Sequence, residues 1–149
     1  MSPSATSAAP LPGAPFIHSR AGQLMVEDVA LDALARQHGT PLFVYSSESI
    51  LQALSAYQRG LAGRDALVCY AMKANSTLAI LKLLADQGCG FDIVSGGELE
   101  RALAVGADPA KIIFSGIGKT RTEMARALQA GIGCFNVESL AELDVLSEV

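Results

Sequence analysis

The chain contains no tryptophan, and aromatic residues make up only 5% of its 149 positions. Its core therefore cannot be organised around large rings. Hydrophobic residues as a whole make up 50% of the sequence, so the core must be packed mainly from Ala, Leu, Ile and Val side chains. This length and hydrophobic content are enough for one domain with a core of its own.

Several signals of location and partner are also absent. No apolar run approaches the roughly 18 residues that a membrane-spanning helix requires, so we expect no membrane contact. The formal charge of −4 and the lack of a basic cluster argue against nucleic acid as a partner. Residues 1–15 lack the basic flank and the apolar segment of a signal peptide, and we expect them to form a disordered tail.

Cysteine is scarce as well, since Cys69, Cys89 and Cys134 are the only three. An odd number without Cys-x-x-Cys spacing is not typical of a disulfide framework or of a metal site. We therefore expect buried, reduced, structural cysteines in a cytoplasmic protein, and no metal. His18 and His38 lie beside the tail and at a helix end, where we expect no acid–base role.

Residues 16–41 are expected to form an N-terminal strand and helix that lead into the main domain. The short run Gln23–Val26 predicts the strand. A helix is predicted over Leu31–Gln37, because Gly39 is placed to end it and Pro41 follows just beyond.

From residue 42 onward, short apolar runs typical of buried strands recur at nearly regular intervals. These runs are Leu42–Tyr45, Leu67–Met72, Gly90–Val94, Lys111–Ser115 and Gly133–Val137. A helical pattern fills each gap between them. Strands that alternate with helices in this way predict βαβ crossovers and a parallel sheet.

The predicted helices also begin and end with recognisable signals. In a capping box, a Ser or Thr side chain accepts a hydrogen bond from the amide three residues later, and a Glu there reaches back to the first amide. Three segments fit this pattern: Ser95–Glu98, Thr120–Glu123 and Ser139–Glu142. Gly88, Gly106 and Gly131 stand where glycines commonly end helices.

Two folds fit this alternation: a (β/α)8 barrel, which takes about 250 residues, and an open, doubly wound sheet of five strands. No G-x-G-x-x-G follows the first strand and no acidic residue ends the second, which disfavours a dinucleotide-binding sheet. The last helical pattern continues to Val149 without a stop signal. We therefore expect an α/β fold in which residues 42–149 form the first five βα units of a truncated barrel.

Lys73 is the main candidate for chemistry. It follows the run Leu67–Met72, and the polar step Asn75–Thr77 separates it from the next helical pattern. The carboxyl end of a parallel strand lies at the mouth of an α/β fold, where such proteins place their active sites. Partial burial there would favour the neutral amine, which can attack a carbonyl carbon and hold it as a Schiff base. From position alone, an ordinary solvated lysine remains the alternative.

Four motifs, in order and at matching spacing, together resemble one family of enzymes. They are Tyr70–Ser76 (Y-A-M-K-A-N-S), Phe91–Leu99 (F-D-I-V-S-G-G-E-L), Ile113–Thr120 (I-F-S-G-I-G-K-T) and Cys134–Ser139 (C-F-N-V-E-S). The first resembles the Y-A-x-K-A-N motif of fold-type III pyridoxal 5'-phosphate (PLP) decarboxylases. The second is similar to the version found in the diaminopimelate decarboxylases of that family. The resemblance runs from about Gly22 to Val149.

The resemblance implies a PLP-binding barrel of the alanine-racemase-like type in which Lys73 is catalytic and holds the cofactor aldehyde covalently. Ala71, on the same strand face, would leave room for the cofactor ring. Asp92 would end the neighbouring strand and hold the ammonium group of Lys73 in place. We assign Glu98 to its capping box rather than to catalysis, and Ser115–Lys119 to a strand-to-helix turn rather than to the phosphate site.

The reaction that the resemblance implies is decarboxylation of the amino acid meso-2,6-diaminopimelate to L-lysine, a step of lysine biosynthesis, by a homodimer with shared active sites. The family's phosphate loop, ring-stacking histidine, pyridine-pairing acid and C-terminal β-domain have no counterpart in this sequence. We expect the chain alone to be inactive. We also expect it to aggregate, because a partial barrel exposes sheet edges and helix faces.

Three other functions stay open. A fold-type III decarboxylase of another amino acid, such as arginine or a carboxylated polyamine, would be distinguished by a panel of substrates. A non-enzymatic PLP-binding barrel protein would need a closed barrel and a phosphate loop in one chain. A structural or regulatory fragment would show no covalently held cofactor even when the remaining part of the fold is supplied.

Overall fold

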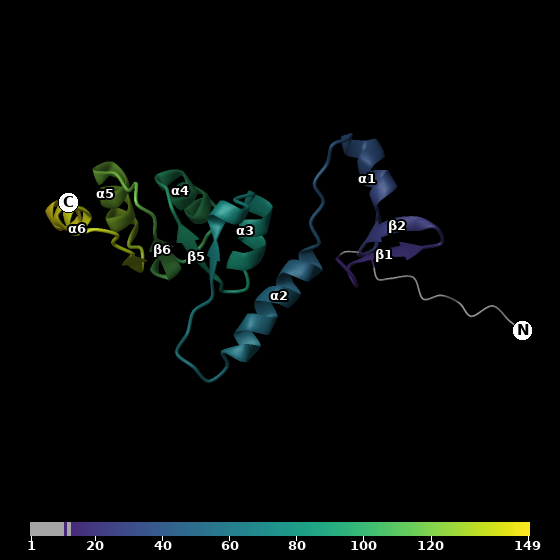
Figure 1. Cartoon of the computed structure of the whole chain (residues 1–149), viewed down its shortest axis with the longest axis horizontal. Coiled ribbons are helices and arrows are strands. Elements are labelled where there is room, and N and C mark those ends of the chain that lie inside the picture. The colour runs from purple at the N-terminus through teal and green to yellow at the C-terminus, as the bar shows by residue number, and fades with distance from the viewer. Residues whose placement is uncertain (1–10, 12) are drawn as a thin grey trace, which may run out of the picture. The chain divides into compact units, whose positions relative to one another are not determined.

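The computed structural model describes residue 11 and residues 13–149, so most of the expected tail over residues 1–15 lies outside the described residues. The chain divides into two compact units, Met1–Gln52 and Ala53–Val149 (Figure 1). Within the described part of the chain, no helix has both the length and the apolar character needed to cross a membrane.

The first unit contains a small antiparallel sheet, a helix that follows it, and the first residues of a longer helix. The sheet consists of β1 (Ile17–Arg20), β2 (Gln23–Val26) and β3 (Val29–Ala30), and the helix is α1 (Leu31–His38). The predicted strand over Gln23–Val26 and the predicted helix are both confirmed. The two flanking strands were not predicted, because neither has an apolar run; of the three strands only β2 has buried side chains, Met25 and Val26.

The predicted strand over Leu42–Tyr45 is wrong. These residues are in an irregular segment that pairs with no other strand in the part of the chain that the structure describes. Phe43 is 85% exposed and Tyr45 is 57% exposed. Apolar composition gives a segment strand propensity, but a strand also needs a neighbouring backbone to bond to, and composition does not supply one.

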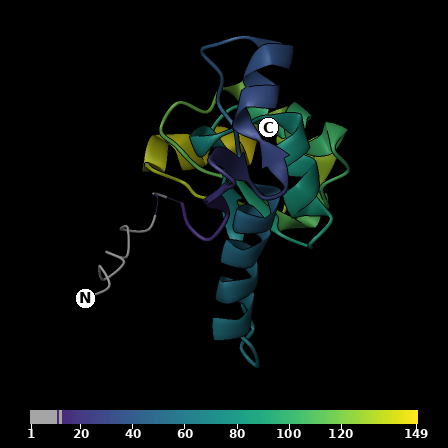
Figure 2. The ribbon, with the colours of Figure 1, turned by 90° about the vertical axis from the view of Figure 1, so that its right-hand side faces the viewer.

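Helix α2 (Ser47–Gly60) follows and runs without a break, as Figure 2 shows. Its start is tied to Glu27 in the first unit. One carboxylate oxygen of Glu27 accepts a 2.8 Å hydrogen bond from the backbone N–H of Glu48 and a 2.7 Å bond from the hydroxyl of Ser46. These two bonds, the backbone bond first, hold the pKa of Glu27 below its ordinary value.

The second unit is built on a four-stranded parallel sheet whose strands are adjacent in chain order. The strands are β4 (Cys69–Ala71), β5 (Gly90–Ile93), β6 (Ile112–Phe114) and β7 (Cys134–Phe135). Four of the five predicted strands are therefore confirmed in place, although each is shorter than its apolar run. The order β4-β5-β6-β7 without reversal is that of a barrel wall, since a doubly wound sheet reverses its order at a switch point.

A helix follows each of these strands, and the helices lie one after another along the sheet (Figure 1). They are α3 (Leu78–Ala85), α4 (Gly96–Ala104), α5 (Arg121–Ala130) and α6 (Leu140–Glu148), with short 3-10 turns η1 (Met72–Ala74) and η2 (Pro109–Lys111). Strand residues with no exposed surface face the helices: Phe91, Ile93, Ile112 and Phe114. Alternate residues face the other way and are only partly covered, as Ala71 and Asp92 are. The core therefore lies on one face of the sheet, and the second face is left for small and polar groups.

Only one of the three predicted capping boxes is complete. At α5, the Thr120 hydroxyl accepts from the amide of Glu123 and the Glu123 carboxylate accepts from the amide of Thr120. At α4, Ser95 caps the helix, but the Glu98 carboxylate accepts a 2.7 Å bond from the amide of Val94 instead of that of Ser95.

The start of α6 departs from the box in the same way. The Ser139 hydroxyl accepts from the amide of Glu142, and the Glu142 carboxylate accepts a 3.1 Å bond from the amide of Glu138. Both glutamates thus bond the amide of the residue that precedes the cap. This fixes the end of the strand-to-helix loop as well as the start of the helix. The predicted cap roles are right for the serines and wrong for these two carboxylate partners.

Candidate active site

Lys73 lies in η1, directly after β4, at the carboxyl end of the first strand of the parallel sheet. The turn that carries it is closed by the residues around it. The Tyr70 hydroxyl donates a 3.1 Å hydrogen bond to the carbonyl oxygen of Asn75, and the Asn75 side chain accepts a 3.0 Å bond from the amide of Thr77 at the start of α3. The tyrosine and asparagine of the Y-A-M-K-A-N motif therefore shape the turn that presents the lysine.

The Lys73 side chain is exposed, whereas the sequence predicted partial burial. Its amine makes no hydrogen bond or ion pair with any residue that the structure describes. Other lysines of the same unit are engaged: Lys82 pairs with Asp86, and Lys119 pairs with Glu142. Lys73 thus presents an uncommitted amine at the mouth of the sheet.

Ala71 and Asp92 are brought together by the register of the sheet. They are direct partners in the parallel pairing of β4 with β5, so their side chains share the face opposite the helices. Lys73 follows Ala71 by two residues. The three residues that the sequence singled out therefore lie at the same end of two adjacent strands, and Ala71, whose side chain is a single methyl group, is the direct neighbour of Asp92.

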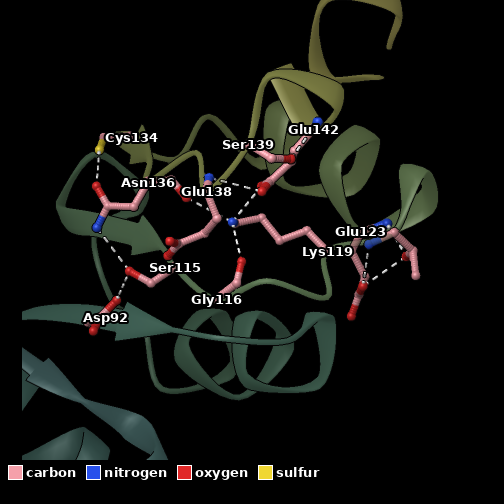
Figure 3. A network of polar contacts seen from close by, with 11 residues as sticks. Asp92, Ser115, Gly116, Lys119, Glu123, Cys134, Asn136, Glu138, Ser139 and Glu142 are labelled. Atoms are coloured by element: carbon pink, nitrogen blue, oxygen red, sulfur yellow. Dashed lines mark hydrogen bonds and ion pairs between the residues drawn. The ribbon is translucent and has the colours of Figure 1, made fainter. Parts of the chain in front are cut away.

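A chain of hydrogen bonds leads from Asp92 across the next two strands (Figure 3). The Ser115 hydroxyl, just after β6, donates a 2.5 Å bond to Asp92 Oδ1. The Asn136 side-chain amide, just after β7, donates a 3.0 Å bond to the Ser115 oxygen. The Cys134 thiol lies 3.8 Å from Asn136 Oδ1 as a weak donor. Asp92 is half-buried, and these bonds hold its carboxylate from the β6 side.

Lys119 joins the loops that carry Ser115 and Asn136. Its ammonium group donates to the carbonyl oxygens of Gly116 at 2.5 Å and Asn136 at 2.8 Å, and to Glu142 Oε1 at 2.6 Å. These three bonds use all the donors of an ammonium group. The lysine side chain has 0% exposure, and its Nζ lies 6.0 Å from the centre of the Phe114 ring.

The turn at Ser115–Lys119 is confirmed as a strand-to-helix connection. It offers no phosphate site of the lysine type, because the Lys119 ammonium is fully engaged with protein oxygens. The hydrogen bond from Lys119 is also the first cause that lowers the pKa of Glu142 below its ordinary value.

Glu123 joins the two preceding loops. Its Oε1 accepts a 2.7 Å bond from the amide of Gly96, at the start of α4, and its Oε2 accepts from the amide and hydroxyl of Thr120. These bonds, that of Gly96 first, lower the pKa of the Glu123 carboxyl. Together with Lys119, this carboxylate fixes three consecutive loops at the mouth of the sheet.

The cysteines differ in their surroundings. All three thiols are free; Cys89 is buried, as predicted, but Cys69 is only half-buried and Cys134 is exposed, so the predicted burial is wrong for Cys134. Burial raises the pKa of the Cys69 thiol, and the charges of Asp92 and Cys134 raise it further. Burial likewise raises the pKa of Cys89. Neither raised thiol is activated as a nucleophile.

The sequence singled out Lys73, Ala71 and Asp92 but missed the roles of Ser115 and Asn136. A signal for them was present: Ser115 stands two residues after Ile113, the β6 partner of Asp92, and side chains two apart share a face. The assembled group, a free amine, a small residue and an anchored carboxylate, fits a carbonyl compound that carries a cationic or proton-bearing group. PLP is such a compound.

Comparison with known proteins agrees with this chemistry. Residues 47–149 match the family described as pyridoxal-dependent decarboxylase, pyridoxal binding domain. The chain is 55% identical over 130 residues to the diaminopimelate decarboxylase of Pseudomonas aeruginosa, a match that covers 87% of this chain and 31% of that protein.

Two crystal structures are similar in fold. AQ1208 from Aquifex aeolicus has a TM-score of 0.86 and 47% identity, and the match covers 91% of this chain and 33% of that one. Diaminopimelate decarboxylase from Helicobacter pylori, complexed with L-lysine, has a TM-score of 0.77 and 44% identity, over 79% of this chain and 30% of that one. The chain therefore spans about a third of the length of the relatives that it matches.

Proposed function

The chain belongs to the pyridoxal-dependent decarboxylase family, and from this premise we propose that it forms the Lys73-bearing wall of an enzyme that converts meso-2,6-diaminopimelate to L-lysine. The observation that carries the proposal is the uncommitted amine of Lys73 at the carboxyl end of β4, beside the paired residues Ala71 and Asp92. The term full-length protein denotes the whole protein that contains this sequence.

PLP is the cofactor of this family, and three residues of this chain would hold it. Lys73 would bond covalently to the aldehyde carbon, because its amine has no competing partner among the described residues. Ala71 would leave the space beside the strand open to the ring. Asp92 would accept a hydrogen bond from the Lys73 nitrogen or hold it as an ammonium ion. The bound cofactor supplies the electron sink that allows the carboxylate to leave.

The proposed substrate, location and assembly rest on the relatives. Diaminopimelate decarboxylase is the name of the Pseudomonas aeruginosa protein, and the Helicobacter pylori enzyme of that name was crystallised with L-lysine, the product of the proposed reaction. For the full-length protein we propose an amino-acid substrate, a cytoplasmic location and a homodimer with shared active sites. We propose no nucleic-acid or membrane partner.

A substrate panel tests this function. The full-length protein, supplied with PLP, is incubated with meso-diaminopimelate, arginine, ornithine, lysine and a carboxylated polyamine, and released carbon dioxide is measured. We expect release from meso-diaminopimelate, with L-lysine as the product. Release from another amino acid alone would replace the proposed substrate, and release from none would contradict an enzymatic function.

A pair of lysine variants shows whether the activity depends on this site. Lys73→Met removes the proposed covalent attachment, so we expect activity to fall below detection. Lys82→Met removes another exposed lysine, which pairs only with Asp86, the residue just after α3, and we expect full activity. Equal loss in both variants would mean that Lys73 has no special role.

A further inference from the structure

The site predicted from sequence consists of Lys73, Ala71 and Asp92. Hydrogen bonds extend from Asp92 to residues outside this set. Asp92 Oδ1 accepts the 2.5 Å bond from Ser115, whereas no described residue donates to Oδ2. Ser115 approaches from the β6 side of Asp92. The other neighbour of Asp92 in the sheet is β4, which leads directly to Lys73. One oxygen is thus anchored from one side, and the second is left for a donor at the Lys73 side or above the sheet.

The direction of each hydrogen bond in the series Asp92–Ser115–Asn136 follows from the donors and acceptors present. A carboxylate only accepts hydrogen bonds, and a serine hydroxyl has a single proton, so Ser115 must donate that proton to Asp92. The Ser115 oxygen can then only accept from Asn136, which requires the NH2 group of the asparagine to face it. Every group in the chain therefore has one allowed orientation while Asp92 is ionised.

The backbone that carries Ser115 and Asn136 is itself held by hydrogen bonds. The amide of Ser115 donates 2.8 Å to the carbonyl oxygen of Ile93, and the amide of Asn136 donates 2.9 Å to that of Phe114, so the sheet ladder continues under both residues. Lys119 ties the Asn136 carbonyl oxygen to the loop at Gly116 (Figure 3). A lost hydrogen bond in the chain could not readily be replaced by movement of this backbone.

We propose that Ser115 and Asn136 are positioning residues that lock the Asp92 carboxylate in the orientation from which its free oxygen serves the Lys73 amine and the cofactor bound there. This inference rests on the proposed function of Lys73 and extends it to two side chains that follow β6 and β7 directly. Neither residue contacts Lys73, so each acts only through Asp92.

The first test is a set of serine variants of the full-length protein. For each, the Kd for PLP, kcat, KM and the pH dependence of the absorption of the bound cofactor are measured. Ser115→Ala removes the donor, and we expect a loss of about tenfold to a hundredfold in PLP affinity or kcat, the range for one hydrogen bond to a charged group. We also expect the pH dependence of the absorption to shift. Ser115→Thr keeps the hydroxyl and should restore both.

Ser147→Ala is the matched control. Ser147 is exposed on α6, and its hydroxyl donates only to the backbone oxygen of Asp144. We expect no change in affinity, kcat or pH dependence. A general loss of folded protein would lower thermal stability in Ser115→Ala without moving the pH dependence, which would overturn the positioning role.

A double-mutant cycle separates action through Asp92 from an independent effect. In an Asp92→Asn background, Ser115→Ala and Asn136→Ala should cause little further loss, because the residue they position is already changed. Losses that multiply in full would overturn the inference. If borohydride reduction labels Lys73 while all these variants match the unmodified protein, the proposed function stands and only this inference fails.

Discussion

Lys119 and Glu142 form an ion pair of 2.6 Å in which the lysine side chain has no exposed surface. The same ammonium group bonds the carbonyl oxygens of Gly116 and Asn136, so one cation joins the loops that follow β6 and β7. The mouth of the sheet is therefore held by a buried charge whose partners come from three separate segments.

Lys119→Met in the full-length protein should be strongly destabilising. It leaves the Glu142 carboxylate and two carbonyl oxygens without their donor, and removal of one partner of a buried pair costs about 3–5 kcal/mol. Thermal unfolding measures the loss. Lys82→Met is the control, because the Lys82 side chain is 56% exposed and its pair with Asp86 should contribute less than about 1 kcal/mol. Equal shifts in the two variants would show that the Lys119 contacts contribute nothing special.

The lowered carboxylate pKa values predict a loss of stability in acid. The pKa of Glu123 is below its ordinary value of 4.5 because the amides of Gly96 and Thr120 donate to the charged form. A lowered folded-state pKa stabilises the protein above the unfolded-state value and stops doing so as pH falls through the folded-state value. The stabilisation should thus be complete at pH 7 and decline below about 4.5.

Glu123→Gln in the full-length protein isolates this contribution, since glutamine resembles the protonated acid. Urea unfolding is measured for the variant and the unmodified protein between neutral and acid pH. The difference in free energy of unfolding should be largest at neutral pH and should shrink as pH falls below the ordinary carboxyl value. A difference that stays constant over the whole range would contradict an ionised, hydrogen-bonded Glu123.

The strands of the sheet could be predicted from sequence because each combines an apolar run with a helix start soon after it. Phe91 and Ile93 show why: both are fully buried, and both belong to a run whose following helix is capped by Ser95. The segment Leu42–Tyr45 has the same composition but no bonding partner in the described chain. Hydrogen bonding between strands depends on two segments, so the composition of one segment does not show whether it will pair.

Gly90→Ala in the full-length protein should weaken the sheet at the base of β5. An added Cβ would lie 2.6 Å from the carbonyl oxygen of Lys111 and 2.7 Å from the sulfur of Cys69. The strands must separate to admit it, at a cost of about 1–3 kcal/mol by analogy with overpacked cores. Gly60→Ala, in α2 with open space around it, should be neutral or slightly stabilising. Thermal unfolding that ranks Gly60→Ala below Gly90→Ala would contradict the close packing.

The isolated 149-residue chain should not decarboxylate meso-diaminopimelate. Its Lys73 is exposed, and Lys73, Ala71 and Asp92 are the only described residues that we propose to contact the cofactor. Water would reach a cofactor held there, and no described group would hold the phosphate. Carbon dioxide release is measured for the chain with added PLP and compared with that of the full-length protein. Release at the same rate by both would contradict this prediction.

The site was predicted only as far as motifs and strand ends reach. Lys73 and Asp92 follow from the motifs and from the end of a strand. The roles of Ser115, Asn136 and Lys119 depend on hydrogen bonds between residues 17 to 23 positions apart. Sequence shows that such residues exist but not which donor meets which acceptor. The glutamates that bond one residue beyond their predicted caps were missed for the same reason.

Chemical trapping tests the central claim most directly. The full-length protein is incubated with PLP, reduced with borohydride and digested, and the modified peptide is identified by mass spectrometry. We predict a single pyridoxyl group on Lys73, absent from Lys73→Met and present in Lys82→Met. A label on another lysine, or none at all, would contradict the assignment of Lys73 as the residue that holds the cofactor.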